Sequence, residues 1–257
     1  MTSGPFALTV LGSATPYPTA DNPCSGYLVS SGDTRIWMDA GTGTLAQLQR
    51  HVRLDELAAI WISHLHADHC ADLLTAYYGA LFADVRLAAP IPLYGPAGIA
   101  DRLAHFLSNT PRRSPVESAF DVHELRDGHH VQVGALTLTS RSVVHGIPAF
   151  AVRMETGGRS LVYSGDTAPC ATLTSLAERC DVLLSEAESA QPCAEDDEQV
   201  HHTPEEAGDT AGAARVARLI VTHVGRFLTP HQAVQRAGTR FDGPIDHAAP
   251  GMTFPIG

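Results

Sequence analysis

The sequence contains no lysine, and all seventeen of its basic residues are arginines. The 28 acidic residues outnumber them and leave a formal net charge of -11, and no run of basic residues interrupts this excess. An acidic surface repels polyanions, because binding to a nucleic-acid backbone depends on basic side chains. We therefore expect no long RNA or DNA partner, although a small anion held by metal ions remains compatible with the composition.

The sequence also contains few cysteines, and their spacing does not indicate disulfide pairs. The five cysteines are odd in number and include no Cys-x-x-Cys pair, which argues against a disulfide framework and against a cysteine zinc site. The sequence also lacks a basic-then-apolar leader and any apolar run of membrane length. We expect a cytoplasmic protein without a membrane partner.

The length of 257 residues, with 44% hydrophobic and 18% charged residues, suits a globular protein with one well-filled core. We expect a single domain over residues 1–257. Apolar runs and alternating segments predict strands, and segments of helical periodicity lie between them. The expected strands are 6–11, 27–30, 35–38, 58–62, 91–94, 119–124, 131–133, 136–144, 150–155, 160–164, 181–185 and 219–222. The expected helices are 45–51, 71–81, 97–107, 170–179, 204–215 and 230–238. This mixture predicts a layered α/β sandwich.

The strongest chemical signal is the segment His64-Leu-His-Ala-Asp-His69, which directly follows an apolar strand. Imidazole and carboxylate groups are ligands that zinc, manganese and iron accept. A loop at a strand end can direct His64 and His66 to one ion, and Asp68 and His69 to a second. The alternative is a cluster of surface or core histidines without a metal.

This segment resembles the His-x-His-x-Asp-His signature of the metallo-β-lactamase superfamily. His145, Asp166 and His223 follow in the family's order, and each stands where an apolar strand ends. Alone, each histidine would be unremarkable and Asp166 would be a turn residue. The resemblance implies the metallo-β-lactamase fold, which is a four-layer αββα sandwich. It also implies two divalent metal ions, zinc or alternatively manganese or iron, bridged by Asp166. The implied ligands are His64, His66, Asp68, His69, His145, Asp166 and His223.

Asp39 follows the third expected strand, in the segment Met38-Asp-Ala-Gly41. It resembles the early aspartate of the family, which supports the His-rich loop from behind the metal ligands. The alternative role for Asp39 is a simple turn cap.

Within the superfamily the chain is most similar to the RNase Z-like phosphodiesterases, including the small atypical cyclic-nucleotide phosphodiesterases of actinobacteria. His201-His-Thr203 resembles the His-x-Thr/Ser element of that branch, which makes His201 the acid–base candidate and His202 its competitor. His202, Thr203 and Arg226 are candidate substrate contacts. Thr203 also suits a helix N-cap, with Glu206 completing a capping box, and Arg226 is otherwise a surface arginine.

Two departures narrow the function that the resemblance implies. RNase Z enzymes of the bacterial type carry a basic arm between the third histidine and the bridging aspartate, whereas His145 and Asp166 are too close for such an arm. True β-lactamases of this fold usually have cysteine at the position of Asp166. A role in tRNA processing and a role in antibiotic hydrolysis are therefore both disfavoured.

The leading hypothesis is hydrolysis of a small phosphodiester, such as a cyclic nucleotide, by a metal-bound hydroxide. Asp68 would orient that hydroxide, and His201 would protonate the leaving oxygen. The first alternative is another ester-type hydrolase of the fold: a thioesterase, an arylsulfatase-like enzyme, a lactonase or a glyoxalase-type enzyme. The second alternative is a non-catalytic binding module. From the resemblance we also expect a homodimer.

Overall fold

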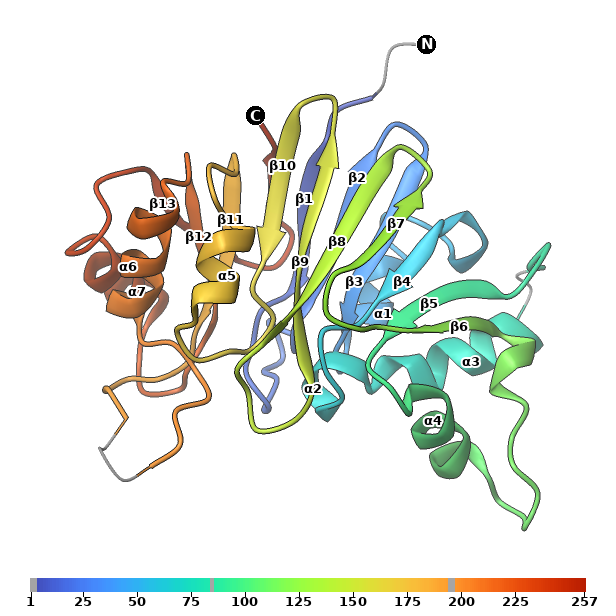
Figure 1. Cartoon of the computed structure of the whole chain (residues 1–257). Coiled ribbons are helices and arrows are strands. Elements are labelled where there is room, and N and C mark those ends of the chain that lie inside the picture. The colour runs from blue at the N-terminus through green and yellow to red at the C-terminus, as the bar shows by residue number, and fades with distance from the viewer. Residues whose placement is uncertain (1–3, 84–85, 194–196) are drawn as a thin grey trace.

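The computed structural model describes residues 4–83, 86–193 and 197–257, and two seven-stranded sheets form its centre (Figure 1). The first sheet has the order β14-β1-β2-β3-β4-β5-β6. Its strands are β1 (Ala7–Gly12), β2 (Gly26–Ser31), β3 (Thr34–Ala40), β4 (Ala59–Trp61), β5 (Ile91–Gly95), β6 (Phe120–Glu124) and β14 (Thr253–Pro255).

The second sheet has the order β13-β12-β11-β10-β9-β8-β7. Its strands are β7 (His129–Val133), β8 (Leu136–Val143), β9 (Ala149–Thr156), β10 (Arg159–Tyr163), β11 (Val182–Ala187), β12 (Leu219–Val224) and β13 (Ile245–His247). In both sheets an antiparallel half continues into a parallel half, β3 to β6 in the first and β10 to β13 in the second. Parallel strands end on the same side of a sheet, so each sheet brings several strand ends together.

Helices cover the outer faces of both sheets (Figure 1). On the first sheet lie α1 (Thr44–Leu48), α2 (Ala67–Cys70), α3 (Asp72–Phe82) and α4 (Ile99–Leu107), and on the second lie α5 (Ala171–Leu176), α6 (Pro204–Ala214) and α7 (Pro230–Ala237). Single 3-10 turns occur at Leu54–Glu56 and Val116–Ser118.

Three separate apolar clusters show how the layers pack. The inner cluster takes side chains from both sheets, among them Val10 and Trp61 from the first and Leu138 and Tyr163 from the second. One outer cluster joins the first sheet to α1, α3 and α4, and the other joins the second sheet to α5, α6 and α7. Three interfaces between four layers make the αββα sandwich that the sequence predicted.

The predicted elements recur in the structure with small shifts of their ends. Two strands were missed, β13 and β14, because each has only three residues and lies among exposed proline and glycine positions. The segment that we predicted as a loop, residues 64–69, is only partly one, since α2 begins at Ala67. Where the structure describes the chain, every helix is too short or too polar to cross a bilayer.

All five cysteines are unpaired, and they differ in accessibility. Cys24, Cys70 and Cys180 are buried, whereas Cys170 and Cys193 are partly exposed. Burial raises the pKa of the Cys24 and Cys70 thiols to about 11 and that of Cys180 to about 12. A buried thiol that stays protonated is a poor nucleophile.

We expect only Cys170 and Cys193 to react with dithionitrobenzoate in the native protein at mildly alkaline pH. The other three thiols should react only after denaturation, because burial denies them both the thiolate form and access to the reagent. The measurement is a spectrophotometric thiol titration before and after adding guanidinium chloride. Rapid labelling of Cys24, Cys70 or Cys180 in the native protein, located by mass spectrometry, would contradict the packing described above.

Candidate metal centre

The candidate site is built from strand ends that meet at one end of the sandwich. β4 leads into the His-rich segment, β8 into His145 and β10 into Asp166, while His223 is the penultimate residue of β12. β4 belongs to the first sheet and the other three strands to the second, so the site spans both sheets. Two groups of donors result, and within each group the donor atoms lie within 4.8 Å of one another.

The His-rich segment changes backbone direction at His66. This residue is the N-cap of α2, with φ -69° and ψ 150°, and Asp68 and His69 lie inside the helical turn that follows. The turn separates the four side chains into two pairs, His64 with His66 and Asp68 with His69. These are the pairs that we expected to face one ion each.

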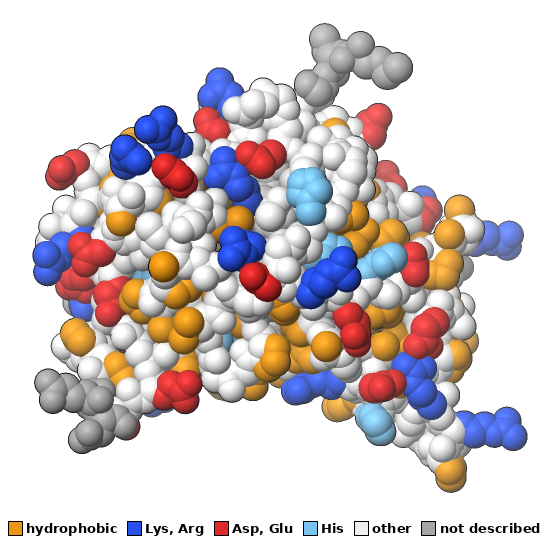
Figure 2. Space-filling view, in the orientation of Figure 1, with side chains coloured by type: hydrophobic (Ala, Val, Ile, Leu, Met, Phe, Trp, Pro, Cys, Tyr) orange, Lys and Arg blue, Asp and Glu red, His pale blue; other side chains and the backbone are white. Residues whose placement is uncertain are grey.

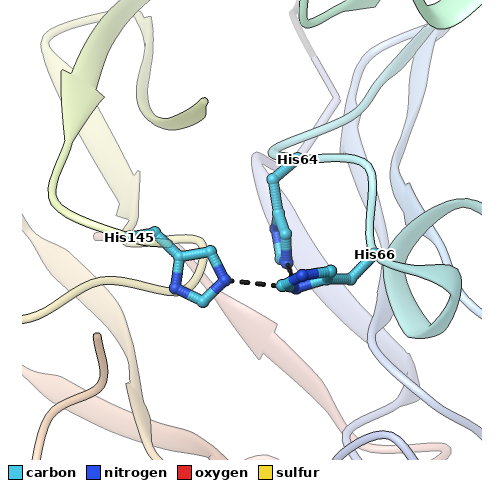
Figure 3. Close-up of side chains that lie close together, drawn as sticks. All are labelled: His64, His66 and His145. Atoms are coloured by element: carbon cyan, nitrogen blue, oxygen red, sulfur yellow. Dashed lines mark hydrogen bonds between the residues drawn. The ribbon is translucent and has the colours of Figure 1, made fainter. Parts of the chain in front are cut away.

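The first group consists of His64, His66 and His145, whose rings converge (Figure 3). Nδ1 of His66 lies 3.0 Å from Nε2 of His64 and 3.2 Å from Nε2 of His145. His64 is buried, His145 is half-buried and His66 is exposed, so this group faces solvent on one side. Burial lowers the pKa of His64 well below its usual value and also lowers the pKa of His145, which favours the neutral, metal-binding form of both rings.

The second group consists of Asp68, His69, Asp166 and His223, and all four side chains are buried. Oδ2 of Asp166 lies 3.3 Å from Nε2 of His69 and 3.4 Å from Nε2 of His223. Oδ2 of Asp68 lies 3.4 Å from Nε2 of His69.

Three buried atoms of the second group have no hydrogen-bond partner: Nε2 of His69, Nε2 of His223 and Oδ1 of Asp166. Buried polar atoms are nearly always paired, so three unpaired atoms within one donor group point to a further binding partner. A divalent cation fits this donor set, because imidazole and carboxylate ligands suit zinc and related metals.

Asp166 also lies between the two groups. Its Oδ2 is 3.7 Å from Nε2 of His64 in the first group, in addition to its contacts in the second. Burial alone would raise the pKa of Asp166, but the surrounding His223, His69 and His64 hold it well below its usual value. The carboxylate is therefore ionised and has the position of a bridge.

Asp39 holds the His-rich segment from behind. Its Oδ1 accepts a hydrogen bond from the Ser63 amide (2.7 Å), and its Oδ2 accepts from Ser63 Oγ (2.7 Å), His69 Nδ1 (2.7 Å) and Tyr163 Oη (2.8 Å). The carboxylate thereby fixes the His69 ring with Nε2 turned to the second group. These contacts favour the supporting role of Asp39 over a turn cap.

Other histidines of the site are oriented in the same way, through the nitrogen that faces away from the cluster. Nδ1 of His145 donates to the Val200 carbonyl at 3.0 Å, and Nδ1 of His223 lies 2.9 Å from Ser25 Oγ. His223 adopts φ 47°, in the left-handed region that a histidine seldom occupies. Backbone strain of this kind is typical of functional sites that the surrounding structure holds in place.

Gly41 makes room for the second group. A Cβ atom at this position would collide with the carbonyl oxygen of Asp68 and lie 2.6 Å from that of Ser25. The turn after β3 therefore packs directly beneath α2, and only glycine permits this approach.

His201 lies beside the two groups and is held by two acidic residues that the sequence analysis did not single out. Its Nδ1 donates to Glu186 Oε1 at 2.9 Å and its Nε2 to Glu188 Oε2 at 2.7 Å. Burial by itself would lower the pKa of His201, but these two carboxylates raise it to about 11. The signal that could have found them is the pair Glu186-Ala-Glu188 at the end of a buried strand.

Asp166, Glu186 and His201 also lie close enough together to be a third candidate group. The oxygens of Glu186 are already used, however, because Oε1 accepts from the Thr167 amide (2.8 Å) and Oε2 from the Glu188 amide (3.1 Å). The two groups with unpaired or converging donors are therefore the better metal sites.

His202 does not face the site. Its side chain is fully buried, Nδ1 donates to the Thr167 carbonyl (2.7 Å), and Nε2 lies 3.2 Å from Thr210 Oγ1. Burial lowers its pKa to about 4, so the ring is neutral. This position favours His201 over His202 as the acid–base residue and does not support the predicted substrate contact by His202.

Thr203 and Arg226 occupy different environments. Thr203 is buried and caps α6, with Oγ1 accepting from the Glu206 amide at 3.3 Å in a capping box, so its position supports the structural role. Arg226 is exposed and lines a cavity together with His201. It therefore remains a candidate substrate contact.

The chain is similar to known proteins over most of its length. The family model described as the beta-lactamase superfamily domain matches residues 34–224. The uncharacterized protein ML1173 of Mycobacterium leprae is 34% identical over 254 residues, which cover 97% of this chain and 88% of the relative. A ribonuclease Z of Mycobacterium bovis is 30% identical over 271 residues, which cover 93% of this chain and 94% of the relative.

A solved structure shows the same architecture over the whole chain. The metallo-beta-lactamase fold protein YhfI of Bacillus subtilis matches with a TM-score of 0.83 and 25% sequence identity, covering 98% of this chain and 99% of that chain. The predicted metallo-β-lactamase fold is confirmed.

We expect Asp39→Asn to weaken zinc binding by about 10- to 100-fold, because an amide cannot replace the charged acceptor that orients His69. The measurement is a competition titration with a chromophoric chelator. Asp181→Asn is the matched control, since Asp181 accepts several hydrogen bonds but lies at the opposite end of β11 from Glu186. Equal zinc affinity of the Asp39→Asn protein and its parent would show that Asp39 does not support the site.

Proposed function

The chain belongs to the beta-lactamase superfamily, and from this premise we propose that it is a binuclear metal-dependent phosphodiesterase acting on a small phosphodiester. A cyclic nucleotide is the substrate that we propose first. The proposed ligands are His64, His66 and His145 for one ion and Asp68, His69 and His223 for the other, with Asp166 between them.

One observation carries the proposal: the buried Asp166 carboxylate lies between two convergent donor groups, and in the second group Nε2 of His69, Nε2 of His223 and Oδ1 of Asp166 have no protein partner. An isolated buried charge is costly, and a bound cation removes that cost. We propose zinc as the native metal, with manganese or iron as alternatives that the same donors accept.

A pair of such ions would activate a water molecule for attack and stabilise the negative charge that develops on the phosphoryl oxygens. Asp68 has a carboxylate in the second group and would orient the attacking water. His201 is cationic between Glu186 and Glu188, so it can donate a proton to the leaving oxygen. Its Nε2 donates to Glu188, whose side chain is half-buried. The leaving oxygen would therefore have to take the place of Glu188 as the acceptor of the Nε2 proton.

Two features support a phosphodiester over other esters. His201 with Glu186 adds a proton donor beside the proposed metals. A relative that is 30% identical carries the name ribonuclease Z, an enzyme name that denotes cleavage of phosphodiester bonds in RNA.

Other features support a small substrate. Between His145 and Asp166 the chain forms only the β9–β10 hairpin, with no arm that could hold a long nucleic acid. On the face seen in Figure 2, arginines are scattered among acidic side chains.

We also propose that the chain acts as one domain, because the inner cluster combines both sheets, and that it forms a homodimer.

The discriminating experiment is a panel assay of the zinc-loaded protein. Bis(p-nitrophenyl) phosphate and cyclic AMP represent phosphodiesters, and a thioester, an aryl sulfate and a lactone represent the other hydrolases of this fold. We expect turnover of the diesters. Selective turnover of another ester would show that the protein is a hydrolase of that ester and not a phosphodiesterase. Stoichiometric metal binding without any turnover would favour a binding module.

We expect Asp166→Ala to lose both metal and activity, because Asp166 would contact both ions. His201→Ala should keep the metal and lose turnover by about 100-fold or more, the usual contribution of a general acid. The measurements are elemental analysis and steady-state kinetics on bis(p-nitrophenyl) phosphate. A fully active Asp166→Ala protein would rule out the bridging role.

Glu186→Gln should lower kcat while leaving KM and metal content close to those of the parent. Glutamine can still accept from the Thr167 amide, but it no longer supplies the charge that holds His201 protonated. Kinetics and metal analysis of Glu186→Gln, beside Glu205→Gln, whose side chain pairs with Arg236 of α7 outside the two donor groups, provide the comparison. An unchanged kcat would show that Glu186 has no part in the proton transfer.

A further inference from the structure

Two strongly exposed aromatic side chains line the cavity beside His201. Tyr17 is 85% exposed and Phe227 is 74% exposed, and both border a cavity of about 540 Å³ that His201 and Glu188 also line. Exposed apolar side chains that border one cavity together with polar groups are a feature of ligand-binding grooves. Neither residue contributes to the hydrophobic clusters of the fold.

The walls of the cavity are held in place by close backbone packing. Gly225 lies against the backbone of Glu188, and a Cβ atom at residue 225 would collide with the Glu188 carbonyl oxygen. The close packing of the Gly225 and Glu188 backbones fixes the position of Phe227 relative to His201. On the other wall, Tyr17 stands between Pro16 and Pro18, whose rings limit the backbone.

Arg226 adds a planar surface to this cavity. Its guanidinium carbon lies 4.6 Å from the centre of the Phe227 ring. Within the described parts of the chain Arg226 has no ion-pair partner, so its charge is free to face a ligand. Guanidinium and aromatic planes are the surfaces on which nucleobases and other planar rings stack.

We propose that this cavity is a subsite for a planar aromatic group of the substrate, with Tyr17 and Phe227 as its specificity-determining residues. The inference rests on the proposed function, since the phosphate would be held at the metal groups while the ring lies on the His201 side. A nucleobase is the chemical class that fits best, because stacking accepts any planar ring and Arg226 tolerates an anion nearby.

A second cavity is the competing place for such a ring. It measures about 590 Å³ and is bordered by Leu65, Leu74 and Phe106, with Arg102 at its side. Its lining is almost entirely apolar and includes none of the proposed catalytic side chains. The cavity that His201 lines is therefore the one where a bound ring would lie beside a proposed catalytic side chain.

The test compares two ligands of which one carries a nucleobase and the other does not. Adenosine 5′-monophosphate and ribose 5-phosphate carry the same phosphate and sugar, and calorimetric titration of zinc-loaded protein measures both affinities. We expect the parent to prefer the nucleotide by roughly tenfold or more, the size of one or two stacking contacts. Tyr17→Ala and Phe227→Ala should each weaken nucleotide binding by roughly fivefold or more and leave ribose 5-phosphate binding unchanged.

Two variants serve as controls. Phe82→Ala removes an equally exposed phenylalanine, 73% exposed, at the end of α3 and outside this cavity, so it should change neither affinity. Tyr17→Phe keeps the ring and should keep the preference for the nucleotide.

Equal affinity of the parent for the two ligands would overturn the subsite. A preference that survives Tyr17→Ala and Phe227→Ala but is lost in Phe106→Ala would also overturn it, by placing the ring in the second cavity. Either result with intact turnover of bis(p-nitrophenyl) phosphate refutes the subsite alone. Failure of the zinc-loaded protein both to bind either phosphate and to turn over any diester would refute the proposed function and the subsite with it.

Discussion

The buried carboxylate of Asp166 is the constraint on which the rest of the site depends. It is 2% exposed and has histidine nitrogens at 3.3, 3.4 and 3.7 Å. A carboxylate in this position must be compensated by positive charge or become protonated. Burial by itself would lower the pKa of His69, but Asp166 and Asp39 raise it well above its usual value, so in the protein alone this ring supplies positive charge. In the proposed enzyme metal ions would supply that charge, and His69 would be a neutral ligand. The contacts of Asp39 with His69 and of Ser25 with His223 follow from the need to hold those rings in one orientation.

The fold meets this constraint by bringing donors from both sheets to one end of the sandwich. The His-rich segment follows a strand of the first sheet, whereas His145, Asp166 and His223 belong to the second, so the donors meet only when the inner cluster is packed. Site formation and folding are therefore linked. Tyr163 illustrates the link, because its ring packs against Tyr27 and Trp61 in the inner cluster while its hydroxyl donates to Asp39. A residue of the core thus also orients the residues behind the metal site.

Sequence patterns predicted most of the fold because nearly every central strand is an uninterrupted apolar run between turn residues. They missed β13 and β14, whose pairing is decided by neighbouring strands and not by their own three residues. The order of ligand residues predicted which side chains would converge. It did not reveal Glu186 and Glu188, since two acidic residues after a strand are common in any soluble protein. The sequence favoured His201 over His202 only through the family resemblance, because the contacts of His202 with Thr167 and Thr210 that separate the two residues are tertiary.

The proposed action of this acidic protein on an anionic substrate raises an apparent conflict, which the short range of screened charges resolves. The net charge of -11 is spread over the whole molecule, and salt at physiological strength screens exposed charges beyond about 8 Å. A phosphate at the site would experience mainly the groups in contact with it: the proposed metal ions and the cationic His201, with Arg226 at the border of the adjoining cavity. The surrounding acidic surface then acts chiefly on longer polyanions, whose charges extend beyond the site. The same charge distribution that would admit the proposed small phosphodiester would therefore disfavour a long nucleic acid, and the proposed selection by size would need no separate structural element.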